Sequence, residues 1–278
     1  MKKINSIIDI ENQYDLILCD IWGVLFDGDR IFPGVHDALS KISKKVFLLT
    51  NSSQRVTVLE AMLNKLQIAR NTHYQLLISS GEFFCQSVIH QTLPLKLPAK
   101  YFFLGKNHQI IANLPNIERV HNHHDAQMLV LAGNVLYKNE IEQINPILED
   151  CAQNQLPLFC LNPDMISMDA DKRPVACDGQ IANHYQQKSG PVIYMGKPNQ
   201  PIYQYALKNS MIHQPKVLMI GDSYSTDGLG ALNSQIDFAL VSSGVEYHHW
   251  QTNNTNMSFE QWIHQQGYQV KWLLDSLN

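Results

Sequence analysis

Short apolar runs alternate with amphipathic segments in the first quarter of this chain. The apolar runs at residues 14–25 and 46–53 are typical of buried strands, and residues 35–45 and 55–68 repeat their apolar positions with helical spacing. The first run is interrupted by an aspartate, and the second ends in hydroxyl and amide side chains. Strands that alternate with helices predict βαβ units and a parallel sheet.

The same alternation returns near the C-terminus. Residues 216–233 form an apolar strand, then a loop with two aspartates, then a predicted helix, and residues 238–244 form one more short strand. Residues 258–278 have a helix-like pattern, and we expect them to pack on the outside of the sheet. Both ends of the chain therefore contribute to one parallel α/β core.

A region with its own strands and its own helix separates these two halves. Its apolar runs lie at residues 100–105, 127–133 and 157–164, and an amphipathic helix is predicted at residues 139–155. Because the chain returns to the first fold afterwards, we interpret residues 79–189 as an inserted second domain. The core domain would then be discontinuous, with residues 1–78 and 190–278.

Composition and charge narrow the class of protein. The 278 residues are 45% hydrophobic and 17% charged, which is typical of a globular chain. The net charge is −4 and the basic residues are scattered, so nucleic acid is not an expected partner. No apolar run has membrane-spanning length, and we expect no membrane partner. Five dispersed cysteines indicate reduced thiols in a cytoplasmic protein.

Four short elements carry the candidate chemistry, each at a predicted strand or helix end. They contain, in chain order, Asp20, Thr50, Lys197 (in GKP), and Asp222 with Asp227. Any one of these motifs is short enough to occur by chance, as a capped turn or a solvated loop. All four together, in order and at such ends, indicate one site, because ligands bind beyond the carboxyl ends of parallel strands.

The residue types fit phosphoryl transfer. Asp20 is a nucleophile able to form an aspartyl-phosphate, and Asp20 and Asp222 together form a ligand pair for Mg²⁺. Lys197 supplies a fixed positive charge for the phosphoryl oxygens, and Pro198 begins a helix whose N-terminus favours anions.

Phosphate-binding groups are predicted after the second strand. The Thr50 hydroxyl and the backbone amides of Asn51 and Ser52 are donors for the same phosphate. Asp227 is expected to support the site indirectly, by orienting Lys197 or a metal-bound water.

These motifs resemble the haloacid dehalogenase (HAD) superfamily of aspartyl-phosphate phosphatases. The large insertion, LNPD at residues 161–164 and GDSYSTDGLGA at residues 221–231 are similar to its class IIA branch, the NagD type. The resemblance extends over nearly the whole chain. It implies a Rossmann-like, doubly wound core with an α/β cap that selects a small phosphorylated metabolite, and caps of this type often form homodimers. It also implies Mg²⁺ held by Asp20, the backbone carbonyl of Trp22, and Asp222.

Trp22 departs from the resemblance. Most phosphatases of this family carry aspartate at that position as general acid and base, and one subgroup of class IIA resembles this chain in carrying tryptophan. The backbone carbonyl can still bind metal, but the indole N–H does not titrate. Since general acid–base catalysis contributes about 10²–10⁴-fold, we expect a slow phosphatase or one whose leaving group needs no proton.

Other polar residues are weaker candidates. Asp27 precedes Gly28, a common turn signal, so we interpret it as a turn residue rather than a replacement acid. The histidines at residues 121–125 suggest a metal site, but their tight clustering favours a polar loop, and the same holds for residues 248–249.

Two other functions remain open. Trp22 is compatible with a non-catalytic protein that senses a phosphorylated metabolite, although binding alone does not need a nucleophile such as Asp20. A receiver-like domain phosphorylated on Asp20 is the weaker alternative, because such domains are much shorter and need no inserted cap. We favour the Mg²⁺-dependent phosphohydrolase or phosphotransferase.

Overall fold

The computed structural model describes residues 1–106, 108–133, 135–136, 138–168, 174–253 and 256–277. The chain divides into two compact units. The first, called the core unit below, contains Met1–Thr50, Val56–Ile78 and Lys197–Asn278. The second, called the insert unit, contains Asn51–Arg55 and Ser79–Gly196.

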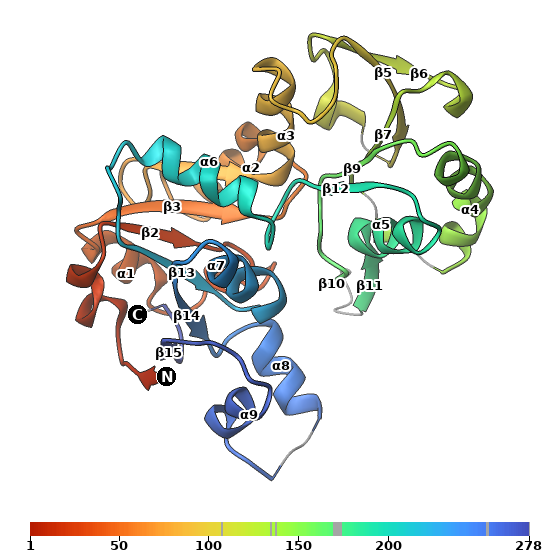
Figure 1. Ribbon diagram of the computed structural model, residues 1–278. Coiled ribbons are helices and arrows are strands. Elements are labelled where there is room, and N and C mark those ends of the chain that lie inside the picture. The colour runs from red at the N-terminus through yellow and green to blue at the C-terminus, as the bar shows by residue number, and fades with distance from the viewer. Residues whose placement is uncertain (107, 134, 137, 169–173, 254–255, 278) are drawn as a thin grey trace. The chain divides into compact units, whose positions relative to one another are not determined.

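A seven-stranded sheet organises the core unit, with the order β1-β15-β14-β13-β2-β3-β4 (Figure 1). Its pairings from β1 through to β3 are parallel. The strands are β1 Lys2–Lys3, β2 Leu16–Cys19, β3 Lys45–Thr50, β4 Leu76–Ser79, β13 Val217–Gly221, β14 Asp237–Val241 and β15 Trp272–Leu274. All residues of β2 and β13 are buried, as expected for the central strands of a parallel sheet.

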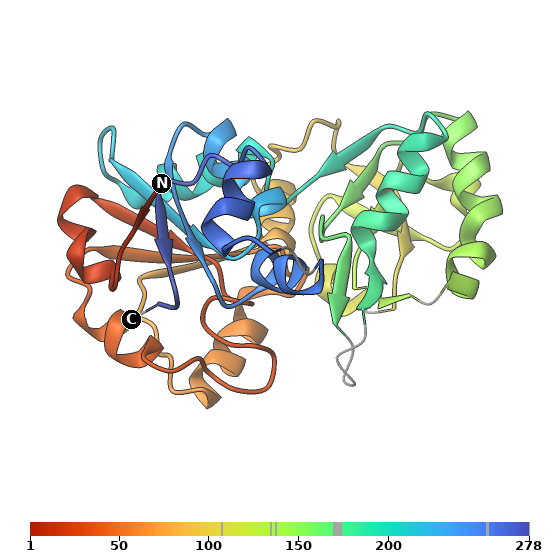
Figure 2. The ribbon, with the colours of Figure 1, turned by 90° about the horizontal axis from the view of Figure 1, so that it is seen from below.

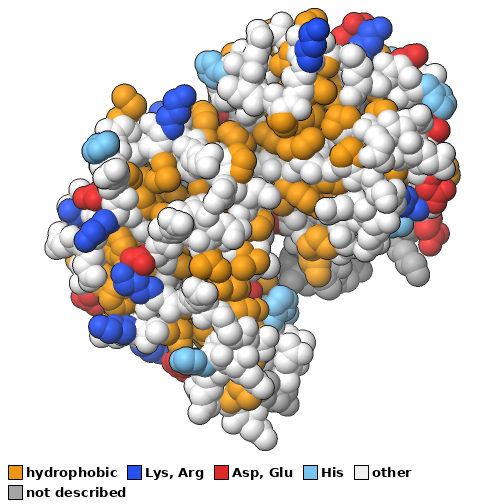
Figure 3. Space-filling view, in the orientation of Figure 1, with side chains coloured by type: hydrophobic (Ala, Val, Ile, Leu, Met, Phe, Trp, Pro, Cys, Tyr) orange, Lys and Arg blue, Asp and Glu red, His pale blue; other side chains and the backbone are white. Residues whose placement is uncertain are grey.

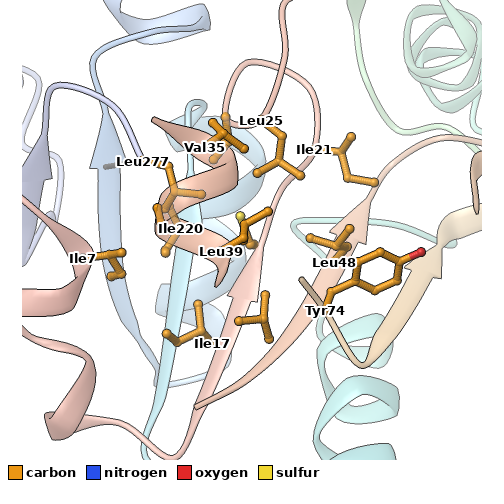
Figure 4. Packing of buried hydrophobic residues seen from close by; sticks show 14 of the residues in the cluster. Ile7, Ile17, Ile21, Leu25, Val35, Leu39, Leu48, Tyr74, Ile220 and Leu277 are labelled. Carbon is orange, nitrogen blue, oxygen red and sulfur yellow. The ribbon is translucent and has the colours of Figure 1, made fainter. Parts of the chain in front are cut away.

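Helices and short helical turns flank this sheet. They are η1 Ile7–Asp9, η2 Glu11–Gln13, α1 Val35–Lys41, α2 Val56–Lys65, α6 Gln200–Ser210, the π-helical turn η5 Tyr224–Gly228, α7 Leu229–Asn233, α8 Val245–Thr252 and α9 Phe259–Gln265. On one face, α1 and α2 bury their apolar side chains against the strands. Val35 and Leu39 of α1 belong to the same buried cluster as Ile17, Leu48 and Ile220 of the strands (Figure 4).

The C-terminal expectation was partly wrong. The helical pattern at residues 258–278 holds only for α9, and residues 272–274 form β15, which pairs with β1 and β14 in the sheet. Trp272 and Leu274 are buried there. A buried strand of three residues is too short for its periodicity to distinguish it from a helix.

The insert unit has its own parallel sheet, with the order β12-β9-β7-β5-β6. Its strands are β5 Ala99–Leu104, β6 Ile117–Val120, β7 Met128–Leu131, β9 Leu158–Cys160 and β12 Val192–Tyr194. A second, antiparallel sheet joins β8 Val135–Leu136, β10 Ile166–Met168 and β11 Pro174–Cys177. Both units thus combine β-sheets with helices, and the predicted α/β fold class is confirmed.

Helices cover both faces of the five-stranded sheet. The helical elements are α3 Ser80–Ile89, η3 His108–Ile111, η4 His123–Asp125, α4 Lys138–Gln153 and α5 Asp178–Gln187. One buried cluster joins α3 and η3 to the sheet, and another joins α4 and α5 to its opposite face. Figure 2 shows α4 and α5, in shades of green, side by side on that face.

The expected return to the core at residue 190 was too early. β12 pairs in parallel with β9, so residues 192–194 belong to the sheet of the insert unit, and the core unit resumes at Lys197. The apolar stretch before the GKP motif has the pattern of a strand, and this pattern fits either sheet equally well. Only the long-range pairing decides between them.

Basic side chains are scattered on the face of the molecule that Figure 3 shows. On the face shown in Figure 3, Lys and Arg side chains stand singly among polar and hydrophobic ones, and its described residues form no continuous basic stripe. Among the described residues, no helix combines the length and apolar character needed to cross a bilayer.

Candidate active site

Three neighbouring strands of the core unit end at one edge of the sheet. Cys19 of β2 pairs with Leu48 of β3 and with Ile220 of β13, all in parallel. Asp20 and Asp222 follow directly after β2 and β13, so the two aspartates emerge side by side. The chain builds the sheet from β2 toward β3 and β4, and later from β13 toward β14 and β15. This reversal of direction is where doubly wound sheets bind ligands.

Three carboxylates converge at this edge and are called the core acidic cluster below. Asp20, Asp222 and Asp227 offer oxygens that all lie within 4.8 Å of one another. Their exposed fractions are 8%, 4% and 0%. Since carboxylate oxygens are the ligands that Mg²⁺ prefers, this donor set fits a hard divalent cation.

Lys197 lies among these carboxylates and is 1% exposed. Its Nζ donates to Asp227 Oδ1 at 2.6 Å and lies 2.8 Å from Asp20 Oδ1. Burial would lower the pKa of Lys197, but the negative charges of Asp20 and Asp227 raise it above its ordinary value. The lysine is therefore a fixed cation, held in place by two of the three aspartates.

One lysine does not neutralise three carboxylates. Burial raises the pKa of Asp227 to about 7, although Lys197 opposes the rise. Burial also raises the pKa of Asp222 well above its ordinary value, and the charges of Asp20 and Asp227 add to the effect. Ionising the whole cluster is thus costly unless a cation joins it, which again fits a metal site.

The turn after β14 fixes the Asp222 side chain, a contact that the sequence did not predict. The backbone N–H of Val245, at the start of α8, donates to Asp222 Oδ2 at 2.7 Å. Gly23 and Gly244 pack against the same carboxylate, and a Cβ on either would lie about 2 Å from Asp222 Oδ2. In the sequence, the only signal for this contact was the group of serine and glycine residues that follows β14.

Trp22 occupies the turn after β2, and its side chain is 41% exposed. The ring packs on Phe26 with 4.3 Å between centroids, and the turn is closed by the Gly23 N–H, which donates to the Phe26 carbonyl at 3.0 Å. The side chain at this position is thus an exposed aromatic ring with no titrating proton.

Asp27 behaves as a turn residue. Its Oδ1 accepts the backbone N–H groups of Asp29 and Arg30, both at 2.9 Å. Such side chain–backbone bonds are the usual reason for aspartate in a turn.

The loop after β3 holds the predicted phosphate-binding residues. Thr50 ends β3 and is 1% exposed, whereas Asn51 begins a short segment of the insert unit and is 3% exposed. Asn51 Nδ2 donates to Asp164 Oδ1 at 2.8 Å, and the Ser52 hydroxyl accepts the Gln54 N–H at 3.2 Å. Asp164 belongs to LNPD, to which sequence reasoning assigned no role.

Further bonds tie this loop to α3. Arg55 makes two hydrogen bonds to Glu82, at 2.7 and 3.2 Å. The Ser79 hydroxyl donates to the Gln54 carbonyl at 2.6 Å while accepting the Glu82 N–H at 3.1 Å. The loop is therefore anchored at both ends within the insert unit.

The two histidine groups differ in their surroundings. His123 and His124 both approach Asp150. This contact was not predicted, since residues 121–125 were expected to form a plain polar loop. His249 Nδ1 lies 3.7 Å from Glu246 Oε2, beyond a normal hydrogen bond.

Two family models match the parts of the chain that carry these residues. Residues 17–114 match a family of haloacid dehalogenase-like hydrolases, and residues 194–261 match a family described as HAD-hydrolase-like. The first match contains Asp20 and Thr50, and the second contains Lys197 and Asp222. No curated protein matches the chain.

Several solved structures share the fold. A haloacid dehalogenase-like hydrolase from Brucella suis 1330 is 25% identical, with a TM-score of 0.79 over 99% of this chain and 100% of that one. A possible sugar phosphatase from Cytophaga hutchinsonii is 22% identical, with a TM-score of 0.75 over 99% and 98%. A glycerol phosphate phosphatase from Mycobacterium tuberculosis, in complex with magnesium, is 19% identical, with a TM-score of 0.66 over 87% and 71%.

Proposed function

We propose that this chain, a haloacid dehalogenase-like hydrolase, is a Mg²⁺-dependent phosphatase of small phosphorylated metabolites. The observation that carries the proposal is the core acidic cluster, with the buried Lys197 beside it, at the ends of adjacent parallel strands. Three buried carboxylates around one lysine are costly to maintain without a chemical use. The phosphatase neighbours of the same fold support the substrate class.

In the proposed reaction, a carboxylate oxygen of Asp20 attacks phosphorus, and the bond to the leaving oxygen breaks with its electron pair. Lys197 offsets charge on the phosphoryl oxygens, together with the Thr50 hydroxyl and the amides of Asn51 and Ser52. Asp20, Asp222 and the Trp22 carbonyl would hold Mg²⁺. When bound, that ion neutralises phosphate charge and lets the carboxylate approach. Water then hydrolyses the aspartyl-phosphate and restores Asp20.

The missing proton donor at Trp22 restricts the leaving group. An alkoxide departs slowly without protonation, whereas a phenolate or carboxylate departs unaided because its conjugate acid is stronger. We therefore expect aryl and acyl phosphates to be better substrates than alkyl phosphates. General acid–base catalysis contributes about 10²–10⁴-fold, which sets the scale of the difference.

The insert unit is proposed as the cap that selects the substrate. It carries residues 51–55, so the phosphate loop and the rest of the cap form one compact unit. Asp164 would position Asn51 for phosphate binding through the hydrogen bond between them. A homodimer formed through this unit is a further prediction, which sedimentation would test.

The test is a panel of aryl, acyl and alkyl phosphates with and without Mg²⁺. We expect Mg²⁺-dependent turnover that is faster on aryl than on alkyl esters, and its loss in Asp20→Asn. Trp22→Asp should raise the alkyl rate by about 10²-fold or more, since it restores a titrating group.

A second candidate function is a sensor that binds a phosphorylated metabolite without turnover. The exposed indole of Trp22 favours it, because the position lacks a proton donor. Mg²⁺ and phosphate binding without turnover in either the parent or Trp22→Asp would support the sensor and overturn the phosphatase.

A further inference from the structure

Two adjacent histidines and an aspartate converge in the insert unit, on residues that the proposed function does not use. His123 Nε2 lies 3.0 Å from Asp150 Oδ2, and His124 Nδ1 lies 3.3 Å from the same oxygen. The two histidines belong to η4, which follows β6, and Asp150 belongs to α4. These three side chains, called the His–Asp cluster below, are the second group in the described chain whose ligand atoms all lie within 4.8 Å.

The spacing of these atoms suits a tetrahedral metal ion. Zinc binds imidazole nitrogen and carboxylate oxygen at about 2.0–2.2 Å, which places neighbouring ligand atoms about 3.3 Å apart around a tetrahedron. The distances from Asp150 Oδ2 to the two ring nitrogens, 3.0 and 3.3 Å, are close to that value. The ligand atoms of the two histidines also lie within 4.8 Å of each other.

The local structure holds the histidines in this orientation. The Asn122 side chain caps η4 by accepting the His124 N–H at 3.1 Å. The His123 ring packs edge-on against Phe102, with 5.8 Å between centroids, and lies 4.2 Å from the His124 ring. Such preorganisation limits the side-chain entropy that metal binding costs.

Solvent can reach the cluster. The side chain of His123 is 20% exposed and that of His124 is 60% exposed, while Asp150 is 36% exposed. An ion therefore has an entry path, and a water can complete a fourth position. Three protein ligands with one open position is a common zinc arrangement.

We propose that His123, His124 and Asp150 bind a divalent transition-metal ion, with Zn²⁺ as the best fit. Imidazole nitrogen suits zinc, cobalt, nickel and copper, whereas Mg²⁺ prefers oxygen ligands. The core acidic cluster has only oxygens and this one has two nitrogens, so the two sites select different ions. The bound ion would join η4 to α4 and stabilise the insert unit.

Hydrogen bonds from two protonated ring nitrogens to the Asp150 carboxylate are the competing explanation. They require no metal, and they predict no change in the protein when zinc or cobalt is added. Metal binding instead requires the coordinating nitrogens to be deprotonated. The two explanations therefore give opposite results in one titration.

The test is a titration of the full chain with Co²⁺ in excess Mg²⁺, which occupies oxygen-only sites. We expect one equivalent of Co²⁺ to give the visible absorption of a tetrahedral site, and Zn²⁺ to displace it. His123→Gln, His124→Gln and Asp150→Asn should each weaken binding more than tenfold. His121→Gln, an exposed histidine of the same segment outside the cluster, is the matched control and should bind like the parent.

Thermal unfolding gives a second measurement. At Zn²⁺ concentrations near a hundred times Kd, the parent and His121→Gln should gain on the order of 5 °C in Tm, and the three cluster variants should not. Circular dichroism verifies that each variant folds, and if one does not, the other two decide. Absence of the cobalt spectrum in the parent, or an unchanged spectrum in folded cluster variants, would overturn the proposal.

Discussion

The core unit and the insert unit hold their carboxylates in different ways. In the core unit, Asp20, Asp222 and Asp227 crowd within 4.8 Å of one another and are at most 8% exposed. Among the ion pairs of the described residues, Lys197 is the cation that serves this cluster. Burial raises the pKa of two of the three aspartates, which means that ionising them in the folded chain is unfavourable.

In the insert unit, the carboxylates of Glu82 and Asp164 pair with separate partners and are more exposed than those of the core acidic cluster. Glu82 binds the Arg55 guanidinium with two hydrogen bonds, and Asp164 accepts the amide of Asn51. Each pair fixes a neighbouring side chain rather than concentrating charge. This difference fits the proposed function, in which the core unit would hold the reacting groups and the insert unit would position a loop.

The largest expected effect comes from removing Lys197, the cation beside the core acidic cluster. Lys197→Met leaves Asp20 and Asp227 buried beside each other with no positive partner. Breaking a buried ion pair on one side costs about 3–5 kcal/mol, so urea unfolding without Mg²⁺ at neutral pH should show a loss of that size. The loss should shrink at pH 5, below the raised pKa of Asp227 of about 7, where that carboxylate is protonated.

Lys188→Met is the matched control in the insert unit. Lys188 also contacts a carboxylate at 2.7 Å, but its partner Glu149 is half exposed. Exposed ion pairs contribute little, so this variant should unfold nearly as the parent does. Equal losses in the two variants would contradict the contrast between the units.

A smaller effect is expected from pH. Because the pKa of Asp227 is raised to about 7 and that of Asp222 is also raised, the folded chain binds more protons than the unfolded chain above about pH 4. Without Mg²⁺, these groups should therefore lower the free energy of unfolding as pH rises from about 4 to about 7.

Mg²⁺ separates this contribution from other titrations. The ion binds the ionised carboxylates, so the stabilisation that it gives should grow from pH 5 to pH 7.5. Thermal unfolding at several pH values, with and without Mg²⁺, measures the difference. A Mg²⁺ effect that is constant across this range would mean that the cluster does not titrate there.

The core site follows from the sequence because local patterns fix it. The apolar runs before Asp20 and Asp222 are fully buried strands, and a buried parallel strand presents its next polar residue at the carboxyl edge of the sheet. The order of β2, β3 and β13 then places the two aspartates side by side. Asp27 was likewise predicted as a turn residue from its neighbour Gly28.

Other features depend on contacts between distant segments. Asn51 and Asp164 are 113 positions apart, and nothing near either residue predicts their hydrogen bond. The same holds for Asp150, which approaches histidines on a different element. Residues 272–274 and 192–194 are short strands whose sheets are decided by long-range pairing rather than by local pattern.

The smallest of these effects concerns the positioning carboxylate of the insert unit. Asp164→Asn keeps the size of the side chain but removes the charge that accepts the Asn51 amide. A hydrogen bond to a charged group contributes about 1.5–3 kcal/mol, and an amide partly replaces it. If Asn51 binds phosphate, KM should rise about tenfold while kcat changes little, because Asp20 and Lys197 are untouched.

Asp150→Asn is the matched control, since it neutralises a carboxylate of the same unit away from the phosphate loop. Without added transition metal, its KM should equal that of the parent. Inorganic phosphate inhibition should weaken in Asp164→Asn by the same factor as KM rises, because both ligands use the same loop. A fall in kcat at constant KM would instead place Asp164 in the chemical step, and the insert unit would then do more than position the loop.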